Sequence, residues 1–341
     1  MSPRPRIYLT SPVFRQMAEN HLVSSAKREK IESLFKTIEN QGELFESPVR
    51  FPSSDEIKKR ASEQKTEIIG CHLSHSIAEE ITALPHLRAV CTATAGYNHI
   101  ARHPGILVTH TPSVLQEAVA DSIIALVLSS LKNIPGLNSF VFDKKWSCDD
   151  KWDMDAFLGR SLSSMTLGII GLGEIGEALA RKLAPWNMTI LYTSRTRKQN
   201  IEAELPGLVW CHSPSCIFSA ADIVSLNVPL TPETRHMAGR DNLSLMKKGS
   251  LLVNTSRGEV VDMNALLDML DSGLITINLA LDVFEPEPLP DSIVDRFNKI
   301  AGKNKNLRFI FMPHTSSADA DTRAEMVIMM LSDILAIASA L

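Results

Sequence analysis

Three short segments in the second half of the sequence each place ionisable side chains just after an apolar run. These side chains are Arg257, then Asp282 with Glu285 and Glu287, and finally His314. Short apolar runs bounded by turn residues indicate buried strands. Parallel strands of α/β proteins end at one edge of the sheet, and that edge binds ligands. We therefore expect a cation, carboxylates and an imidazole to converge on one site, where they could perform acid–base chemistry.

A glycine-rich segment, GLGEIG, begins at Gly171 between an apolar run and an amphipathic stretch. Its spacing is GxGxxG, and each glycine has a physical purpose in dinucleotide binding. Gly171 allows a tight turn, Gly173 lets a pyrophosphate approach the backbone, and Gly176 lets a helix and a strand pack closely. The phosphates would meet the N–H groups that open the helix, including those of Glu174 and Ile175. The segment predicts a dinucleotide cofactor.

The next apolar run suggests which dinucleotide binds. NAD sites place an acidic residue about 20 positions after the glycines, where it holds the ribose 2′-OH. Here that run ends in Ser194, Arg195 and Thr196, without a carboxylate. An arginine beside a hydroxyl suits the 2′-phosphate of NADP, which an aspartate would repel. NADP(H) is therefore favoured, while NAD(H) remains possible and a solvated basic loop is the alternative interpretation.

The elements that must position these residues follow from hydrophobic periodicity. Apolar runs alternate with helical stretches, and this alternation favours parallel sheets covered by helices. A long helix should follow Pro112 and reach Leu131, before a polar, irregular segment at 143–164 that contains Trp146 and Trp152. The expected strands are 7–9, 66–69, 87–91, 107–109, 166–170, 188–193, 223–227, 250–254, 276–281 and 307–312, and further helices are expected at about 78–84, 174–184 and 319–341. This pattern predicts an α/β fold with two doubly wound parallel-sheet domains, Rossmann-like or flavodoxin-like, and a cleft between them.

Composition excludes several classes of protein. The 341 residues include 35 Lys and Arg against 39 Asp and Glu, a formal charge of −4, so no overall field attracts nucleic acid. No apolar run has the length of a membrane span, and the N-terminus lacks the apolar run of a signal peptide. The scattered cysteines form no CxxC pair, so we expect no metal site and a reducing, cytoplasmic location. They are Cys71, Cys91, Cys148, Cys211 and Cys216.

Several motifs together resemble the D-isomer-specific 2-hydroxyacid dehydrogenases. The resemblance runs from about Ile68 to Arg323, and its cofactor strand is most similar to NADPH-dependent glyoxylate/hydroxypyruvate reductases. The motifs are the glycine loop, the three strand ends, Thr94-Ala95-Gly96-Tyr97-Asn98-His99-Ile100, Val119-Ala120-Asp121, and Val228-Pro229-Leu230-Thr231-Pro232-Glu233-Thr234-Arg235-His236. The resemblance implies that residues 1–113 with 315–341 form a substrate-binding domain and residues 114–314 a dinucleotide-binding domain.

The resemblance also implies roles for individual residues. Arg257 would bind the carboxylate and carbonyl of a 2-oxo acid as a two-pronged donor, together with backbone N–H groups at Ala95 and Gly96. His314 would give a proton to the carbonyl oxygen, and Glu287 rather than Glu285 would keep it protonated. The implied cofactor-binding residues are Gly171, Gly173, Glu174, Ile175, Gly176, Ser194, Arg195, Thr196, Val228, Pro229, Thr234, Thr255, Arg257, Asp282 and His314, with Asp282 facing the nicotinamide.

The function expected from this resemblance is NAD(P)H-dependent reduction of small 2-oxo acids, such as glyoxylate or hydroxypyruvate, to D-2-hydroxy acids. The alternative is a dinucleotide-sensing corepressor or binding protein on the same fold. The resemblance further implies a homodimer formed through the helix after residue 113 and the segment around Trp146. Two departures from the family pattern stand out: Ser316 replaces a common glycine, and Ser164-Met165 replace a common Gly-Lys.

Overall fold

The computed structural model describes residues 4–146 and 154–341, and the chain divides into two compact units. The first unit comprises Met1–Leu115 with Ala318–Leu341, and the second comprises Gln116–Ser317. Part of the predicted irregular segment, with Cys148 and Trp152, lies outside the described residues. The confirmed fold class is α/β, with one parallel sheet in each unit.

The sheet of the first unit has the strand order β2-β1-β3-β4-β5, and every neighbouring pair is parallel. Its strands are β1 (Arg6–Leu9), β2 (Glu43–Glu46), β3 (Ile68–Cys71), β4 (Ala89–Thr92) and β5 (Leu107–Thr109). Its helices are α1 (Val13–Gln16), α2 (Ser25–Gln41), α3 (Ser54–Glu63), α4 (Glu79–Thr82) and α13 (Ala320–Ala338). Helices cover both faces, because the strands β3 and β4 are buried throughout and leave no polar side to face water.

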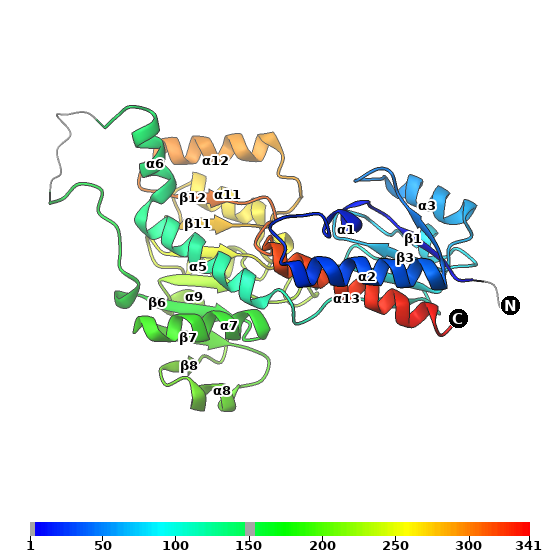
Figure 1. Ribbon diagram of the computed structural model, residues 1–341. Helices are drawn as coiled ribbons and strands as arrows, with labels where there is room; N and C mark the ends of the chain where they lie inside the picture. Colours follow the sequence, from blue (N-terminus) through cyan, green and yellow to red (C-terminus); the bar gives the residue numbers. More distant parts are fainter. Residues whose placement is uncertain (1–3, 147–153) are drawn as a thin grey trace. The chain divides into compact units, whose positions relative to one another are not determined.

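The C-terminal helix α13 belongs to the first unit, which periodicity alone could not decide. It lies beside α2 and packs on β3 and β4 (Figure 1). Its apolar stripe, including Met330, Leu331 and Ile334, forms one core with α2. A separate core around Tyr8, Ile57 and Ile81 fills the opposite face, under α3 and α4.

The sheet of the second unit has the order β12-β11-β10-β9-β6-β7-β8, again with parallel neighbours. Its strands are β6 (Thr166–Ile170), β7 (Thr189–Thr193), β8 (Leu208–Trp210), β9 (Ile223–Leu226), β10 (Leu251–Asn254), β11 (Asn278–Leu281) and β12 (Phe309–Phe311). Its helices are α5 (Gln116–Lys132), α6 (Ile134–Phe142), α7 (Glu174–Leu183), α8 (Gln199–Glu204), α9 (Pro214–Ala220), α10 (Arg240–Ser244), α11 (Met263–Asp271) and α12 (Asp291–Lys303), with 3₁₀ turns η1 (Leu162–Ser164), η2 (Ala184–Trp186) and η3 (Gly258–Val260).

Strand register in the second unit aligns all the candidate site segments. Ile170 of β6 pairs with Leu226 of β9, which pairs with Asn254 of β10. Asn254 pairs with Leu281 of β11, and Leu281 pairs with Phe311 of β12. Every motif singled out in this half of the chain therefore begins within a few residues of the same carboxyl edge. The strand order also reverses direction between β6 and β9, the position where open α/β sheets bind ligands.

The edge strands β2 and β8 and several helices, α6 among them, were not predicted individually from the sequence. β2 and β8 are short edge strands. β2 has a glutamate at each end, and β8 consists of only three apolar residues, of which Val209 is 48% exposed, so neither shows the longer buried apolar run of a central strand. α6 follows α5 after one residue, Asn133, whose left-handed backbone breaks the helix. No single described helix is long and apolar enough to cross a membrane, although α5 and α6, bent by 60° at their junction, meet the test as a pair.

Candidate functional site

His314 and Glu287 lie in hydrogen-bond contact at the carboxyl edge of the second sheet. The Nδ1 atom of His314 lies 2.8 Å from Oε2 of Glu287, and the other carboxylate oxygen of Glu287 accepts a hydrogen bond from the N–H of Phe284 at 2.8 Å. Burial raises the pKa of Glu287, but the contacts with His314 and Phe284 outweigh it and the net shift is downward. Nε2 of His314 is thus the ring nitrogen left for another partner, as proton transfer to a substrate requires.

Asp282 fixes the turn that carries His314. Its carboxylate is buried and accepts hydrogen bonds from the N–H groups of Thr315 at 2.7 Å and Ser316 at 2.8 Å, while its carbonyl accepts from the N–H of His314. His314 itself has a φ of +55°, a left-handed conformation that costs a non-glycine residue energy. The N–H of Ser316, where the family often has glycine, completes this clamp, and its side chain is buried.

Arg257 leaves the end of β10 through a loop held by Asn254. The buried side chain of Asn254 donates to the carbonyl of Arg257 at 2.9 Å and accepts from the N–H of Ser256. The guanidinium is half-buried, and its pKa is lowered mainly by burial, which Glu259 and Glu287 oppose. Gly258 lies against the backbone of Phe284, where a Cβ would overlap the carbonyl. This close approach brings the Arg257 loop next to the loop that bears Glu287.

The glycine loop has the geometry that a dinucleotide needs. Gly171 has a φ of +98°, and a Cβ there would overlap the carbonyl of Asn227. A Cβ on Gly176 would overlap the carbonyl of Gly171, whereas one on Gly173 would meet nothing within 4 Å. Gly173 is the N-cap residue of the ten-residue helix α7 and has no side chain with which to cap the first N–H groups of that helix. The loop therefore fits a pyrophosphate, held by backbone donors at a positive helix end.

The end of β7 presents one unpaired arginine. Arg195 is exposed and makes no hydrogen bond or ion pair within the described residues. The pKa of Glu233 is lowered mainly by a hydrogen bond from Thr231, and the charge of Arg195 adds a smaller effect in the same direction. Its neighbour Ser194 donates to the carbonyl of Thr196 at 2.7 Å. Arg197, by contrast, is occupied: it pairs with Glu202 at 2.8 Å. Among the neighbouring arginines, Arg195 is thus the one available to a ligand.

The remaining predicted residues lie in loops of both units. Thr234 closes the loop after β9 by donating to the carbonyl of Pro229 at 2.6 Å, and Val228 lies beside Gly171. Thr255 follows β10 directly. In the first unit, Ala95 and Gly96 follow β4, and Thr94 donates to the carbonyl of Gly96 at 2.7 Å. In the described chain, the N–H groups of Ala95 and Gly96 donate no hydrogen bond, so both can meet an anion.

Comparisons with known proteins agree with this geometry. Residues 124–316, more than half of the chain, match the family model described as "D-isomer specific 2-hydroxyacid dehydrogenase, NAD binding domain". A glyoxylate reductase of Thermococcus litoralis is 34% identical, over 98% of this chain and 94% of that protein. The chain belongs to the D-isomer-specific 2-hydroxyacid dehydrogenase family. It is accordingly a nicotinamide-dependent oxidoreductase that reduces 2-oxo acids to 2-hydroxy acids.

Solved structures of the family extend the similarity to the whole fold. A glyoxylate reductase from Paecilomyes thermophila has a TM-score of 0.75 and 26% identity, over 98% of this chain and 96% of that one. A D-lactate dehydrogenase from Aquifex aeolicus, complexed with NAD and lactic acid, has a TM-score of 0.73 and 26% identity, over 98% and 95%.

Two residues hold the site of this dehydrogenase in place in ways that sequence reasoning did not foresee. Asn254 orders the Arg257 loop, and Asp282, for which the sequence suggested a contact with nicotinamide, clamps the His314 turn. Their position could have been a signal, because both stand at or just after the last residue of a buried strand. A buried polar side chain there must pair with loop backbone to avoid the cost of an unmade hydrogen bond.

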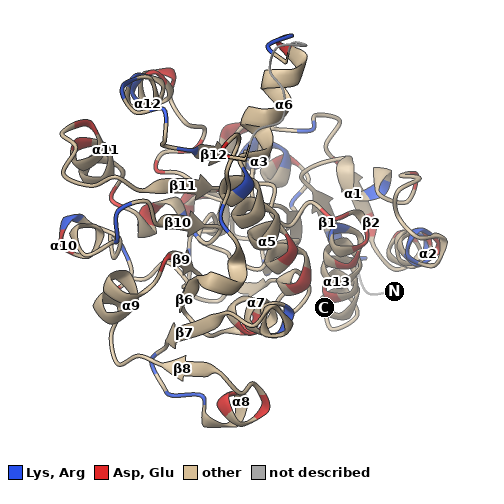
Figure 2. Cartoon of the chain, turned by 90° about the vertical axis from the view of Figure 1, so that its left-hand side faces the viewer, with Lys and Arg blue, Asp and Glu red and all other residues tan. Residues whose placement is uncertain are grey.

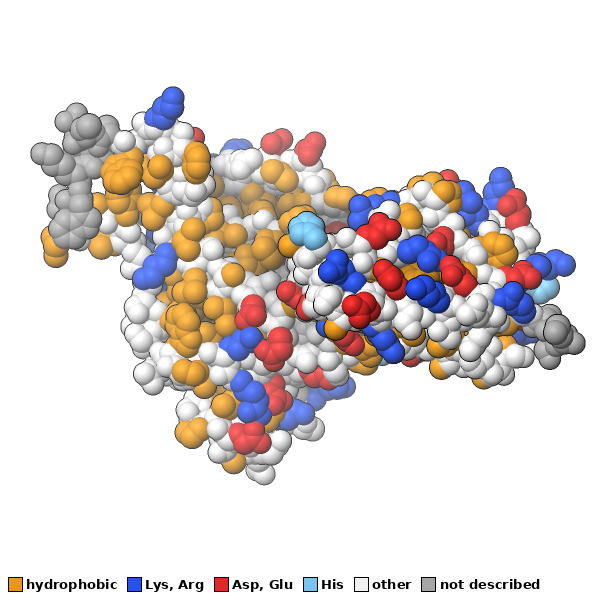
Figure 3. Space-filling model, viewed as in Figure 1, with side chains coloured by type: hydrophobic (Ala, Val, Ile, Leu, Met, Phe, Trp, Pro, Cys, Tyr) orange, Lys and Arg blue, Asp and Glu red, His pale blue; other side chains and the backbone are white. Residues whose placement is uncertain are grey.

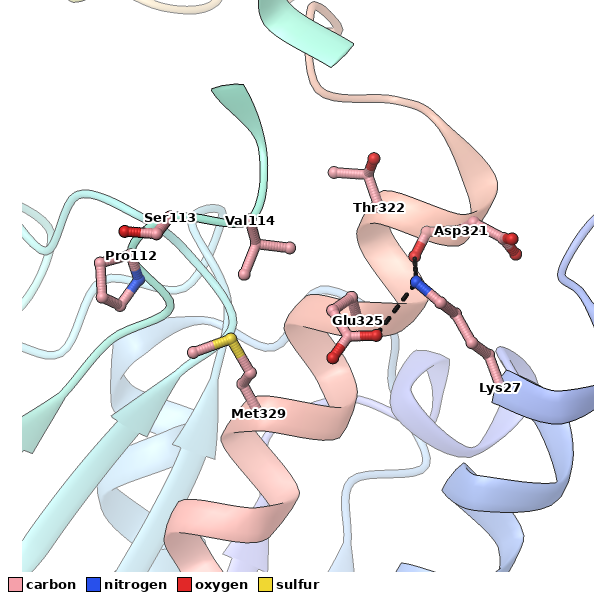
Figure 4. Close-up of a pocket in the computed structure, with 8 residues that line it drawn as sticks. All are labelled: Lys27, Pro112, Ser113, Val114, Asp321, Thr322, Glu325 and Met329. Carbon is pink, nitrogen blue, oxygen red and sulfur yellow. Dashed lines mark hydrogen bonds and ion pairs between the residues drawn. The ribbon is translucent and has the colours of Figure 1, made fainter. Parts of the chain in front are cut away.

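A cavity of about 490 Å³ lies elsewhere, in the first unit of the dehydrogenase (Figure 4). Lys27 reaches across from α2 to α13, where it pairs with Glu325 at 3.0 Å and donates to the carbonyl of Asp321. The Asp321 carboxylate in turn accepts from the N–H of Ser24 at 2.7 Å. Because these polar groups already satisfy one another, we assign no ligand to the cavity.

Proposed function

We propose that this enzyme reduces glyoxylate and hydroxypyruvate to their 2-hydroxy acids, with D stereochemistry where a chiral centre forms, and that it uses NADPH. The observation that carries the reaction is the 2.8 Å contact between His314 and Glu287, together with the close approach of the Arg257 loop to the Glu287 loop at Gly258. The substrate class is supported by relatives described as glyoxylate reductases, including one of Korarchaeum cryptofilum that is 38% identical over 76% of this chain and 75% of that protein.

Each polar group has a distinct role in this proposal. Arg257 and the N–H groups of Ala95 and Gly96 bind the carboxylate, and Arg257 also polarises the carbonyl. When bound, the reduced nicotinamide supplies the hydride. His314 gives the proton on Nε2 to the carbonyl oxygen as the hydride adds to the carbonyl carbon, so the C=O group becomes CH–OH. Glu287 stabilises the protonated imidazole before transfer, and Asp282 keeps the ring aimed.

Oxidation of NADPH, followed by absorbance, tests the reaction against glyoxylate, hydroxypyruvate, pyruvate, phenylpyruvate and 2-oxoisocaproate. We expect the first two to turn over fastest. The variant His314→Asn retains a residue that tolerates the left-handed backbone, and it should lose about 10²- to 10⁴-fold in kcat with unchanged folding. Tight dinucleotide binding without turnover of any 2-oxo acid would favour the dinucleotide-sensing corepressor, which the reductases and dehydrogenases found as relatives do not support.

The NADPH preference rests on Arg195, exposed at the end of β7 where NAD sites carry a carboxylate. A charge-assisted contact with the 2′-phosphate should make Arg195→Gln lose about 10- to 100-fold in kcat/KM with NADPH, and little with NADH. The matched control is Arg197→Gln, which breaks the pair with Glu202 beside the same loop. Equal losses with both cofactors, or a wild-type preference for NADH, would overturn the assignment.

We also propose a homodimer, formed partly by α6. This helix contains no charged residue and none of its residues is buried; Ile134 is 51% and Phe142 79% exposed. α6 is tan in Figure 2, and Figure 3 shows hydrophobic side chains gathered over it. An apolar face of this kind marks an interaction site. We propose a cytoplasmic location as well, which is supported by the four described cysteines, all free thiols.

A further inference from the structure

A second histidine–carboxylate pair lies on the same loop as the first. Glu285 stands two residues before Glu287, and its carboxylate turns to different partners. Nη1 of Arg235 lies 2.8 Å from one of its oxygens, and Nε2 of His236 lies 2.8 Å from the other. Arg235 and His236 belong to the loop after β9, and none of the roles proposed above uses either side chain.

These contacts hold the Glu287 loop through partners other than those of Glu287 itself. Glu287 is bound to His314 and the N–H of Phe284, whereas Glu285 is bound to Arg235 and His236. Only Pro286, with its restricted backbone, separates the two carboxylates. Displacement of Glu285 would therefore shift the backbone from which the Glu287 side chain extends, and with it the 2.8 Å contact to His314.

Arg235 and His236 are also bound to the loop that follows Arg257. The N–H of His236 donates to the carbonyl of Glu259 at 2.7 Å, and Nη2 of Arg235 lies 4.0 Å from the Glu259 carboxylate. His236 has a φ of +55°, the same left-handed conformation as His314. Such a conformation persists only where surrounding contacts enforce it. The pair thus joins the loops of β9, β10 and β11 at one point.

These contacts of Arg235, His236 and Glu285 fix the positions of the loops more than they stabilise the folded protein. The side chains of Arg235, His236 and Glu285 are 48%, 42% and 32% exposed, and ion pairs at such exposure stabilise a protein little. Burial raises the pKa of Glu285, but the hydrogen bonds from His236 and Arg235 lower that pKa by more. The net shift is downward, so the carboxylate stays charged. Three charged residues lie near His314 in addition to this network. They are Glu287, Asp282, which is bonded to the backbone, and Arg257, whose charge lowers the pKa of Glu287.

We propose that Arg235 and His236 are positioning residues, which hold Glu285 and thereby set the contact of Glu287 with the proton donor His314. This inference rests on the proposed function in one respect, the proton transfer from His314. A weaker contact with Glu287 would favour the protonated imidazole less. Activity should fall as the pH rises and His314 loses its proton. When the contacts of Glu285 with Arg235 and His236 are lost, this fall should occur at a lower pH.

The first test is the pH profile of kcat for glyoxylate reduction in Arg235→Gln. We expect a midpoint lower than that of the wild type by about 0.5 pH unit or more, with kcat near neutral pH reduced about 3- to 10-fold and the KM for NADPH unchanged. Arg235→Lys keeps the charge and should restore most of the shift. The matched control is Arg296→Gln, which breaks a 2.6 Å surface pair with Asp268 away from this loop and should leave the profile unchanged.

The second test does not need turnover. The ring titration of His314, followed by NMR in the wild type, Arg235→Gln and Glu285→Gln, should show the same downward shift of the midpoint in both variants. If the wild type reduces no 2-oxo acid, the proposed function fails, while the titration still decides the positioning inference. An unchanged His314 titration in folded Arg235→Gln protein, or an equal shift in Arg296→Gln, would overturn it.

Discussion

At the scale of single residues, the site depends on which carboxylate meets which imidazole. Glu285 and Glu287 are indistinguishable by residue type and lie two positions apart, yet one binds His236 and the other His314. The resemblance selected Glu287 as the partner of His314, and the structure places it there. What the sequence could not reveal is that Glu285 has a histidine of its own, because His236 lies 49 residues away in the chain.

Because the pKa of Glu287 is lowered in the folded protein, we predict that its contribution to stability depends on pH. Its folded-state pKa is below the unfolded value of about 4.3, so its contribution to stability is complete above that pH and is lost as the pH falls through the folded-state pKa. Glu287→Gln should therefore melt below the wild type at pH 7, and the difference should shrink below about pH 4.3. Thermal melts from pH 7 to pH 3 measure this gap. A gap that stays constant with pH would contradict the assigned shift.

At the scale of elements, close approach between loops decides which substitutions the enzyme tolerates. Gly258 passes against the backbone of Phe284 and Glu285, so an added Cβ must push the Arg257 loop away from the Glu287 loop. Backbone cannot move aside as a flexible side chain can. This contact gives Gly258 a role distinct from that of the glycines of the cofactor loop.

The substitution Gly258→Ala should destabilise the protein by about 1–3 kcal/mol and lower kcat/KM with 2-oxo acids. The control is Gly302→Ala, because Gly302 lies in α12 with nothing within 4 Å of its added Cβ. Alanine in an open helical position should stabilise the protein by about 0.4–1 kcal/mol. Chemical denaturation and steady-state kinetics compare the two variants. Equal stability in both would contradict the close packing of Gly258.

At the scale of the whole molecule, the exposed face of α6 predicts self-association. The helix follows α5 so closely that its direction is set by the sharp bend at Asn133 rather than by packing of its own apolar residues. Phe142, Val141 and Ile134 are each about half or more exposed, an unfavourable arrangement in water unless another surface covers them.

Replacement of Phe142 by glutamate should therefore weaken the proposed dimer. Light scattering after size-exclusion chromatography should give twice the chain mass for the wild type and a concentration-dependent decrease toward one chain for the variant. The control Leu274→Glu introduces the same charge at an exposed apolar residue outside α6. Leu274 is 62% accessible, and this variant should leave the mass unchanged. A wild-type protein with the mass of one chain at micromolar concentration would refute the dimer.

The sequence by itself determined the parallel sheets, the glycine loop and the strand ends that carry Arg257, Asp282 and His314, because buried strands and tight turns impose local patterns of apolar residues and glycine. The edge strand β2, with a glutamate at each end, has no such apolar pattern, and the three-residue edge strand β8 was not predicted either. Only the tertiary structure decided that Asp282 clamps the His314 turn and that Arg235 and His236 bind Glu285. These contacts join residues distant in the chain, and their geometry arises from strand register and loop packing, which no local pattern records.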